Sequence, residues 1–390
     1  MCAEHEPVFY DTTLRDGNQA LKHPWNVEEK TVIFEKLVAM GIKIIEVGFP
    51  AACEEELQAC QQLAACAPDD VVVSVLARAT QSDVEKAVRA VEKATHPRIN
   101  VFLAMNPLGL QYVLKKDIHE VTNMAVESVS LAKRLLPRYG EVEFTIEHFG
   151  DCKENLDDVL GAIDQVIQAG ADVVNLANTV ERTSPFEFIK MVRRVKDRVQ
   201  DRVRLSVHCH NDLGMATATT LGSFFEGISQ LETTINGLGE RSGNTNMFEV
   251  ALALHNAGVR VPLKMDTFYS TACLVSDMSH VPIWEKAPLM GKDCFAQRSG
   301  IHQDGANKTN GLNKGQYIAY SPELIGRMDG ERLSFTSQSG KVALEKLCLK
   351  YGYHLSKEQL LQLMPKAKEL ACEKGELEAT DISNLCLDYA

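Results

Sequence analysis

Residues 173–208 read VVNLANTVERTSPFEFIKMVRRVKDRVQDRVRLSVH and contain a complete strand–helix–strand pattern. Short apolar runs at Val173–Leu176 and Arg204–His208 are typical of buried strands. Between them, Pro185–Val199 has apolar residues at three- and four-residue spacing, which predicts an amphipathic helix, and Ser184 stands where an N-cap residue belongs. The stretch is therefore one strand–helix repeat followed by the next strand.

The same alternation extends over the first 260 residues. Further strands are predicted at Val8–Asp11, Ile42–Val47, Val71–Leu76, Ile99–Ala104, Glu143–Glu147 and Thr233–Asn236. Further helices are predicted at Glu28–Met40, Ser82–Ala94 (with Ser82 as N-cap), Ile118–Leu136, Leu156–Ala169, Ala216–Gly227 and Met247–Asn256. Eight strands, each followed by a helix and repeating every ~30 residues, predict an α/β protein with a closed (β/α)8 TIM barrel. An open doubly wound sheet is the alternative, but it more often ends at about six strands.

The alternation stops after Gly258, and this predicts three regions. Residues 1–260 form the barrel domain, residues 261–330 form a linker and small subdomain, and residues 331–390 form a helical C-terminal subdomain. Loop-like clusters occupy Ser299–Gly311. Helices are expected at Lys341–Tyr351, Ser356–Cys372 and Ile382–Leu387, so the barrel is followed by a mostly helical C-terminal region.

Composition and charge exclude several classes of protein. The net charge of −12 argues against a nucleic-acid-binding protein, which normally has a basic face. No apolar run approaches the roughly 18 residues of a membrane span, and Met1–Pro7 lacks the apolar core of a signal peptide. The 11 cysteines contain no CxxC pair, so we expect reduced thiols and a cytoplasmic location.

Residues that can bind a metal ion follow the first, seventh and eighth predicted strands, whose loops meet when the barrel closes. His208 and His210 are two apart on a strand end, so both imidazoles can face one ion. Asp16 can add a carboxylate oxygen and Asn244 an amide oxygen. Such a set, completed by water or substrate, suits a divalent ion such as Zn²⁺, Mn²⁺ or Mg²⁺. The alternative is a hydrogen-bonded histidine pair at the mouth of a loop.

Other polar residues are expected at the same end of the barrel. Arg15 can stabilise an oxygen that becomes negative in a transition state, or it can form a structural ion pair with Glu46 or Glu147. Either carboxylate can act in acid–base catalysis or simply neutralise Arg15. Thr179 can donate its hydroxyl to a substrate carboxylate, or it can cap a loop.

Five motifs in order resemble those of the DRE-TIM metallolyase family, most closely its branch of 2-isopropylmalate and homocitrate synthases. They are DTTLRDGNQ (Asp11–Gln19), IEVGFPAA (Ile45–Ala52), VHCHNDLG (Val207–Gly214), NGLGERSGN (Asn236–Asn244) and SGIHQDG (Ser299–Gly305). The segment Tyr317–Arg327 (YIAYSPELIGR) also matches.

The resemblance implies an acyltransferase that condenses acetyl-CoA with a 2-oxo acid and then hydrolyses the thioester to give a 2-alkylmalate. Asp16, His208, His210 and Asn244 would bind one divalent metal ion, and Arg15 would stabilise oxyanion charge. Glu147 takes the place of the family's site glutamate, and Thr179 that of the threonine binding the 2-oxo acid carboxylate. His302 and Tyr317 match residues that reach the acetyl-CoA end of the site, typically from the partner subunit of a homodimer.

The chain departs from the family's patterns at Asn18, His148, Asn178 and Glu181, which leaves the substrate open. The product we favour is 2-isopropylmalate, made from 2-oxoisovalerate in leucine biosynthesis; homocitrate or citramalate synthesis is the near alternative. The lyase direction and a non-catalytic metabolite-binding barrel are less favoured, because the segment SGIHQDG follows the barrel and no metal ligand is lost.

The side chain of the 2-oxo acid is expected against an apolar wall of Leu108, Leu110 and Phe49. Homocitrate synthases usually place an arginine where Leu110 aligns, to pair with the distal carboxylate of 2-oxoglutarate. A buried carboxylate without a partner costs several kcal/mol, so 2-oxoglutarate is expected to be a poor substrate. Because the chain ends at Ala390, we also expect no dedicated domain for feedback inhibition by leucine.

Overall fold

The computed structural model describes residues 5–309, 315–328 and 334–387. Contacts divide the chain into two compact units. The first comprises Met1–Lys264 with Thr271–Pro282, and the second comprises Met265–Ser270 with Ile283–Ala390.

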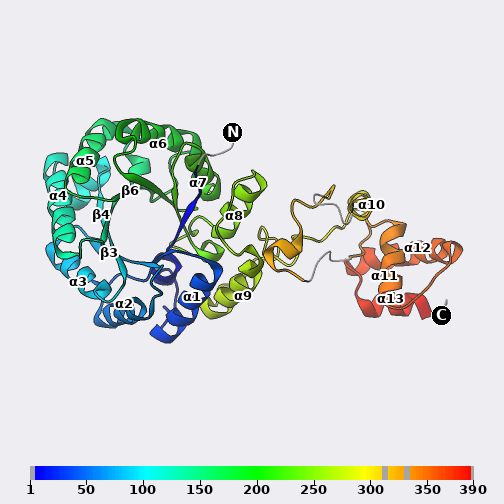
Figure 1. Ribbon diagram of the computed structural model, residues 1–390. Helices are drawn as coiled ribbons and strands as arrows, with labels where there is room; N and C mark the ends of the chain where they lie inside the picture. Colours follow the sequence, from blue (N-terminus) through cyan, green and yellow to red (C-terminus); the bar gives the residue numbers. More distant parts are fainter. Residues whose placement is uncertain (1–4, 310–314, 329–333, 388–390) are drawn as a thin grey trace. The chain divides into compact units, whose positions relative to one another are not determined.

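The first unit contains a closed barrel of parallel strands that are ordered as in the sequence. The strands are β1 (Val8–Asp11), β2 (Ile44–Glu46), β3 (Val72–Arg78), β4 (His96–Ala104), β5 (Glu141–Glu147), β6 (Val173–Asn178), β7 (Arg204–Cys209) and β8 (Gln230–Thr233). Closure is made by β1 and β8, which pair from Val8 with Gln230 to Asp11 with Thr233. Figure 1 shows the strands inside a ring of helices, so the predicted (β/α)8 barrel is confirmed.

A helix follows every strand. They are α1 (Val27–Met40), α2 (Glu54–Cys66), α3 (Gln81–Val91), α4 (Ile118–Leu135), α5 (Leu156–Gln168), α6 (Pro185–Val199), α7 (Ala216–Phe225) and α8 (Met247–Asn256). Ser184 caps α6 as predicted, since its side chain accepts the Glu187 N–H. The N-cap prediction for Ser82 is wrong: Thr80 caps α3 through the Asp83 N–H, and Ser82 lies inside the helix.

The strands of the barrel carry many buried polar side chains, among them Asn100, Glu143 and Glu232. Near the amino-terminal ends of the strands, the fully buried Arg98 donates to Glu143 and Gln230 at 3.0 and 2.8 Å. Strands with buried polar side chains are hard to recognise from apolar runs, and the predicted position of the last strand is therefore wrong. β8 is Gln230–Thr233 and not Thr233–Asn236, since Gln230 and Glu232 interrupt the apolar run that sequence reasoning looks for.

After the barrel the chain forms α9 (Phe268–Ser279), α10 (Gly300–Lys308), α11 (Lys341–Lys350), α12 (Lys357–Lys374) and α13 (Ala379–Cys386). The predicted loop at Ser299–Gly311 is therefore wrong over Gly300–Lys308. The last three helices pack around a small apolar core that includes Leu344, Leu363 and Ile382. Within the described residues, no helix is both long enough and apolar enough to cross a membrane.

Candidate active site

A cavity of about 340 Å³ opens at the carboxyl ends of the strands. It is lined by Arg15, Asp16, Gln19, Phe49, Leu76, Asn100, Phe102, Thr145, Glu147, Asn175, Ala177, Thr179, His208, His210, Glu232, Glu240 and Arg241. Most of the predicted site residues thus meet in one place. The residues come from every strand or the loop after it, which is how this fold assembles active sites.

Three of the predicted metal ligands form a buried cluster. The Nε2 atoms of His208 and His210 lie 3.1 Å apart. Both face the same Oδ2 atom of Asp16, at 3.3 and 3.7 Å. These ligand atoms lie within 4.8 Å of one another, so a single ion can contact all three.

Asn244 lies beside this cluster because an isolated antiparallel bridge pairs its backbone with His210. Its side-chain nitrogen donates to Leu238 O at 3.2 Å. Its Oδ1 atom, like Oδ1 of Asp16, is buried without a hydrogen-bond partner in the described part of the chain. Buried acceptors left unpaired are costly, and a cation would satisfy both. The residues therefore fit a divalent metal ion with two nitrogen and two oxygen donors.

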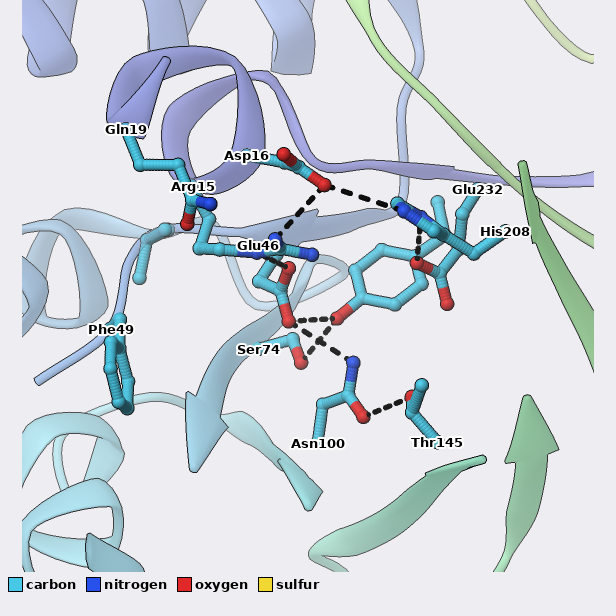
Figure 2. Close-up of polar contacts among 12 residues, drawn as sticks. Arg15, Asp16, Gln19, Glu46, Phe49, Ser74, Asn100, Thr145, His208 and Glu232 are labelled. Atoms are coloured by element: carbon cyan, nitrogen blue, oxygen red, sulfur yellow. Dashed lines mark hydrogen bonds and ion pairs between the residues drawn. The ribbon is translucent and has the colours of Figure 1, made fainter. Parts of the chain in front are cut away.

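Glu232, on β8, orients one of these histidines and was missed by sequence reasoning. Its Oε2 atom lies 3.0 Å from Nδ1 of His208, which turns Nε2 toward Asp16 (Figure 2). A carboxylate behind a metal-binding imidazole is a recurrent supporting contact. Its position could have indicated it: Glu232 lies on the strand beside β7, which carries His208 and ends one residue before His210.

The electrostatics of the cluster favour a positive charge between its members. Burial would raise the pKa of the Asp16 carboxyl, but Arg15 and His208 outweigh burial and hold it well below its usual range. Burial and the neighbouring His208 lower the pKa of His210 to about 3, so its imidazole is neutral, the form that can bind a metal ion. Burial also opposes charge on His208, yet contacts with Asp16 and Glu232 raise its pKa to about 9. The carboxylates that attract a proton there would equally attract a metal ion.

Arg15 lies between two carboxylates at the edge of the cavity. Its Nε donates to Glu46 Oε2 at 2.6 Å, and Nη1 lies 3.0 Å from Asp16 Oδ2 (Figure 2). Glu46 is itself fully buried and accepts from Tyr10 Oη at 3.0 Å and Asn100 Nδ2 at 3.2 Å. The structure thus confirms the ion-pair interpretation of Arg15. It is ion-paired with Glu46 rather than Glu147, and it lines the cavity.

Glu147 and Thr179 also line the cavity. Burial raises the pKa of the Glu147 carboxyl, although the adjacent His148 opposes this. Thr179 Oγ1 accepts the His148 N–H at 2.8 Å, which leaves its own hydroxyl hydrogen for another acceptor. The carbonyl of Thr179 is held in turn by Arg241 Nη2 at 2.7 Å.

The departures from the family's patterns have local partners. Asn18 Oδ1 accepts the Trp25 N–H at 2.7 Å. His148 Nδ1 lies 3.1 Å from Asp151 Oδ2. The buried Glu181 carboxylate accepts the N–H groups of Leu213 and Met215, which ties the loop after β6 to the loop after β7. Asn178 is buried, and its side-chain amide has no hydrogen-bond partner among the described residues.

Of the predicted apolar wall, the structure brings only Phe49 to the cavity. Leu108 and Leu110 are not among the described residues that line it, and Leu108 is 54 % exposed. The physical reason is a turn: Asn106 accepts the N–H groups of Gly109 and Leu110, so the chain enters the short helix η2 (Gly109–Leu114) directly after β4. Leu76 and Phe102 line the cavity instead.

His302 and Tyr317 belong to the second unit, where the structure brings them together. Their rings stack with centroids 4.3 Å apart and planes 19° apart. His302 is exposed on α10 and Tyr317 is half-buried.

Two family models match the chain. A model described as HMGL-like matches residues 6–275, so the barrel is of the HMGL-like class. A model described as alpha-isopropylmalate synthase, post-catalytic domain-like, matches residues 292–348.

Curated relatives define the family more closely. The chain is 48 % identical to 2-isopropylmalate synthase 2 of Leptospira interrogans, over 97 % of this chain and 88 % of that protein. It is 36 % identical to 2-isopropylmalate synthase of Dictyoglomus turgidum, over 97 % and 74 %. The chain belongs to the 2-isopropylmalate synthase family, as the motifs indicated.

Solved structures support the fold alone. The HMG-CoA lyase of Bacillus subtilis superposes with a TM-score of 0.61 at 16 % identity, covering 73 % of this chain and 97 % of that one. The hydroxymethylglutaryl-CoA lyase of Pseudomonas aeruginosa gives 0.60 at 20 % identity, covering 70 % and 92 %.

Proposed function

We propose that this protein condenses acetyl-CoA with 2-oxoisovalerate and hydrolyses the thioester to release CoA and 2-isopropylmalate, a step of leucine biosynthesis. The observation that carries the proposal is a buried Asp–His–His cluster beside Arg15, at the mouth of the barrel, in a chain that is 48 % identical to a 2-isopropylmalate synthase. It is an acyltransferase that converts the acyl group into an alkyl group on transfer.

Asp16, His208, His210 and Asn244 are the proposed ligands of one divalent metal ion, which is Mn²⁺, Mg²⁺ or Zn²⁺. When bound, the ion supplies Lewis acidity that polarises the keto group of the 2-oxo acid. The protein's own contribution is to aim these side chains: Glu232 fixes the ring of His208, and the bridge from His210 brings Asn244 alongside.

The remaining residues bind and orient the substrates. Arg15 donates to the oxygen that becomes negative when the carbon–carbon bond forms. Thr179 directs its free hydroxyl hydrogen to the carboxylate of the 2-oxo acid. Glu147 moves protons: burial raises the pKa of its carboxyl group, and a raised pKa makes a carboxylate a better proton acceptor.

His302 and Tyr317 are proposed to act at the acetyl-CoA end of the site, supplied by the partner subunit of a homodimer. Their support is the motif SGIHQDG and a stacked, partly exposed pair that lies outside the barrel unit. A cytoplasmic location is proposed as well, because the described cysteines are all free, as in a reducing compartment.

The substrate is tested by measuring CoA release from acetyl-CoA with a panel of 2-oxo acids. We expect the highest kcat/KM with 2-oxoisovalerate, because Phe49, Leu76 and Phe102 give the cavity an apolar wall. A hydrophobic pocket separates substrates that differ by one methylene by roughly 1–3 kcal/mol, so pyruvate and 2-oxobutyrate should react more slowly.

2-Oxoglutarate is expected to be the poorest member of the panel. Among the described residues that line the cavity, the arginine and lysine side chains are Arg15 and Arg241. Arg15 is already paired with Glu46 and Asp16, and Arg241 with Asp212. If 2-oxoglutarate or pyruvate is the best substrate, the enzyme makes homocitrate or citramalate instead.

The shared site is tested by mixing two inactive variants, Arg15→Ala and His302→Ala. If each site uses residues of both chains, mixed dimers contain one intact site and activity returns. Subunit exchange is followed with differently labelled chains, and sedimentation gives the oligomeric state. No recovery after complete exchange, or a monomer at working concentration, would contradict the shared site.

A further inference from the structure

A fully buried lysine on α1 has no role in the site described above. The side chain of Lys30 is 0 % exposed and that of Glu56, on α2, is 20 % exposed. Nζ of Lys30 lies 2.8 Å from each oxygen of the Glu56 carboxylate and donates to Val47 O at 3.3 Å. Lysine is almost never fully buried unless it is paired, so this ion pair is a specific feature of the fold.

The same carboxylate holds the loop that follows β2. Glu56 Oε1 accepts the backbone N–H of Phe49 at 3.2 Å. Gly48 packs directly on it: a Cβ atom there would lie 2.2 Å from Glu56 Oε1 and 2.7 Å from Cys60 Sγ. The ion pair therefore contacts the backbone on both sides of Gly48, through the carbonyl of Val47 and the N–H of Phe49.

The ring of Phe49 lines the cavity and lies to one side of the polar network around Arg15 (Figure 2). It meets the ring of Phe102 edge-on, with centroids 6.5 Å apart, and the guanidinium of Arg78 lies 5.8 Å from its centroid. Both are side-chain contacts, and Phe102 also lines the cavity. The backbone of Phe49, in contrast, is held from behind by Glu56.

We propose that the Lys30–Glu56 ion pair positions Phe49 and thereby sets the length of 2-oxo acid side chain that the cavity accepts. Lys30 and Glu56 are positioning residues, and Phe49 is the specificity determinant on which they act. The selectivity part of this inference rests on the proposed function.

An ion pair suits this task better than apolar packing. Apolar side chains of similar volume often stabilise a fold as well as a buried ion pair does. They could not accept the Phe49 N–H or donate to the Val47 carbonyl. These two contacts add to the backbone bonds that Gly48 O accepts from Leu76 N–H and Phe49 O accepts from Ala52 N–H. The pair therefore serves to position the backbone at Val47 and Phe49 rather than to stabilise the fold.

The first test compares kcat/KM for 2-oxoisovalerate with that for 4-methyl-2-oxopentanoate, which is longer by one methylene. Phe49→Ala should lower this ratio by about tenfold or more, the discrimination typical of one methylene. The double variant Lys30→Met/Glu56→Leu should lower it in the same direction by at least about threefold, because a loosened wall loses part of that discrimination. Both charges are removed together since a lone buried charge would endanger folding.

The chain offers a matched control in Lys133 and Asp172. Nζ of Lys133 lies 2.9 and 2.7 Å from the two carboxylate oxygens of Asp172 and donates to Gly140 O, and Asp172 also accepts the Val142 N–H. This pair is more exposed, at 35 and 31 %, and neither residue is among those lining the cavity in the described chain. Lys133→Met/Asp172→Leu should leave the ratio unchanged even where it lowers the melting temperature.

The second test needs no substrate and measures amide hydrogen exchange. In Lys30→Met/Glu56→Leu the Phe49 amide should exchange at least about tenfold faster, because its acceptor is gone, while Val142 is unaffected. In the control variant the Val142 amide should exchange faster and Phe49 should not.

The outcomes separate this inference from the proposed function. The positioning role is overturned if Phe49→Ala lowers the kcat/KM ratio but Lys30→Met/Glu56→Leu leaves it unchanged. It is also overturned if the Phe49 amide exchanges no faster in that double variant. A ratio unchanged in Phe49→Ala would overturn the specificity role. If the wild-type enzyme releases no CoA with any 2-oxo acid, the proposed function fails, whereas amide exchange still decides whether the pair holds Phe49.

Discussion

Removal of the divalent metal ion is expected to abolish CoA release from acetyl-CoA and 2-oxoisovalerate. Asp16, His208 and His210 are buried, and each offers a ligand atom within 4.8 Å of the others, so one divalent ion can contact all three. Lewis acidity at such a site contributes several kcal/mol, and each ~1.4 kcal/mol is tenfold in rate, so the loss should exceed about a hundredfold. Chelation followed by addition of Mn²⁺, Mg²⁺ or Zn²⁺ should restore activity.

Glu232→Gln provides the matched variant for this prediction. The amide keeps the size of the carboxylate but removes the charge that orients His208, at 3.0 Å from its Nδ1. Loss of such a supporting contact typically weakens metal binding by about 10–100-fold. Activity should therefore fall at limiting metal and recover at excess metal. Full activity in a preparation shown by elemental analysis to be metal-free would contradict the assignment.

Arg15→Lys is expected to lower kcat by roughly a hundredfold or more, as removal of an oxyanion donor does. Arginine can bind Glu46 through Nε and Asp16 through Nη1 while its planar fork still faces the cavity. The lysine ammonium keeps the charge but cannot meet both carboxylates and a substrate oxygen with the same geometry. Steady-state kinetics at saturating metal and substrates measures the change.

Arg98→Lys is the control for that substitution. Arg98 is also a buried arginine paired with two carboxylates, Glu141 and Glu143, but it is not among the described residues that line the cavity. We expect a lower melting temperature with little change in kcat. If instead Arg15→Lys retains kcat within about twofold of wild type, Arg15 serves only to neutralise Glu46 and Asp16.

The barrel was predictable from the sequence because it repeats one local pattern. Each apolar strand is followed by an amphipathic helix, and both periodicities are properties of short stretches of chain. β1, α6 and α8 have the predicted bounds. Closure then follows from the number of repeats, and with closure comes the meeting of the loops that carry Asp16, His208 and Asn244.

Local patterns also set the limit of that reasoning. The predicted position of β8 is wrong by three residues because Gln230 and Glu232 are polar. Both are nevertheless buried among the polar groups of the barrel interior. Whether a polar residue on a strand is buried depends on which partners other strands bring to it. Arg98 and Gln230 form a hydrogen bond although they are 132 residues apart in the sequence, and a pattern within one short stretch cannot indicate such a contact.

The sequence by itself determined the class of fold, the catalytic motifs and the family, because these depend on residue types and their spacing along the chain. Only the tertiary structure decided which neighbours act on them. It placed Glu232 behind His208, Glu46 behind Arg15, and the Lys30–Glu56 pair behind Phe49. It also left Leu108 exposed, since the turn set by Asn106 begins a helix directly after β4. Hydrogen bonds and ion pairs act over a few ångströms, and only folding brings such distant residues within that range.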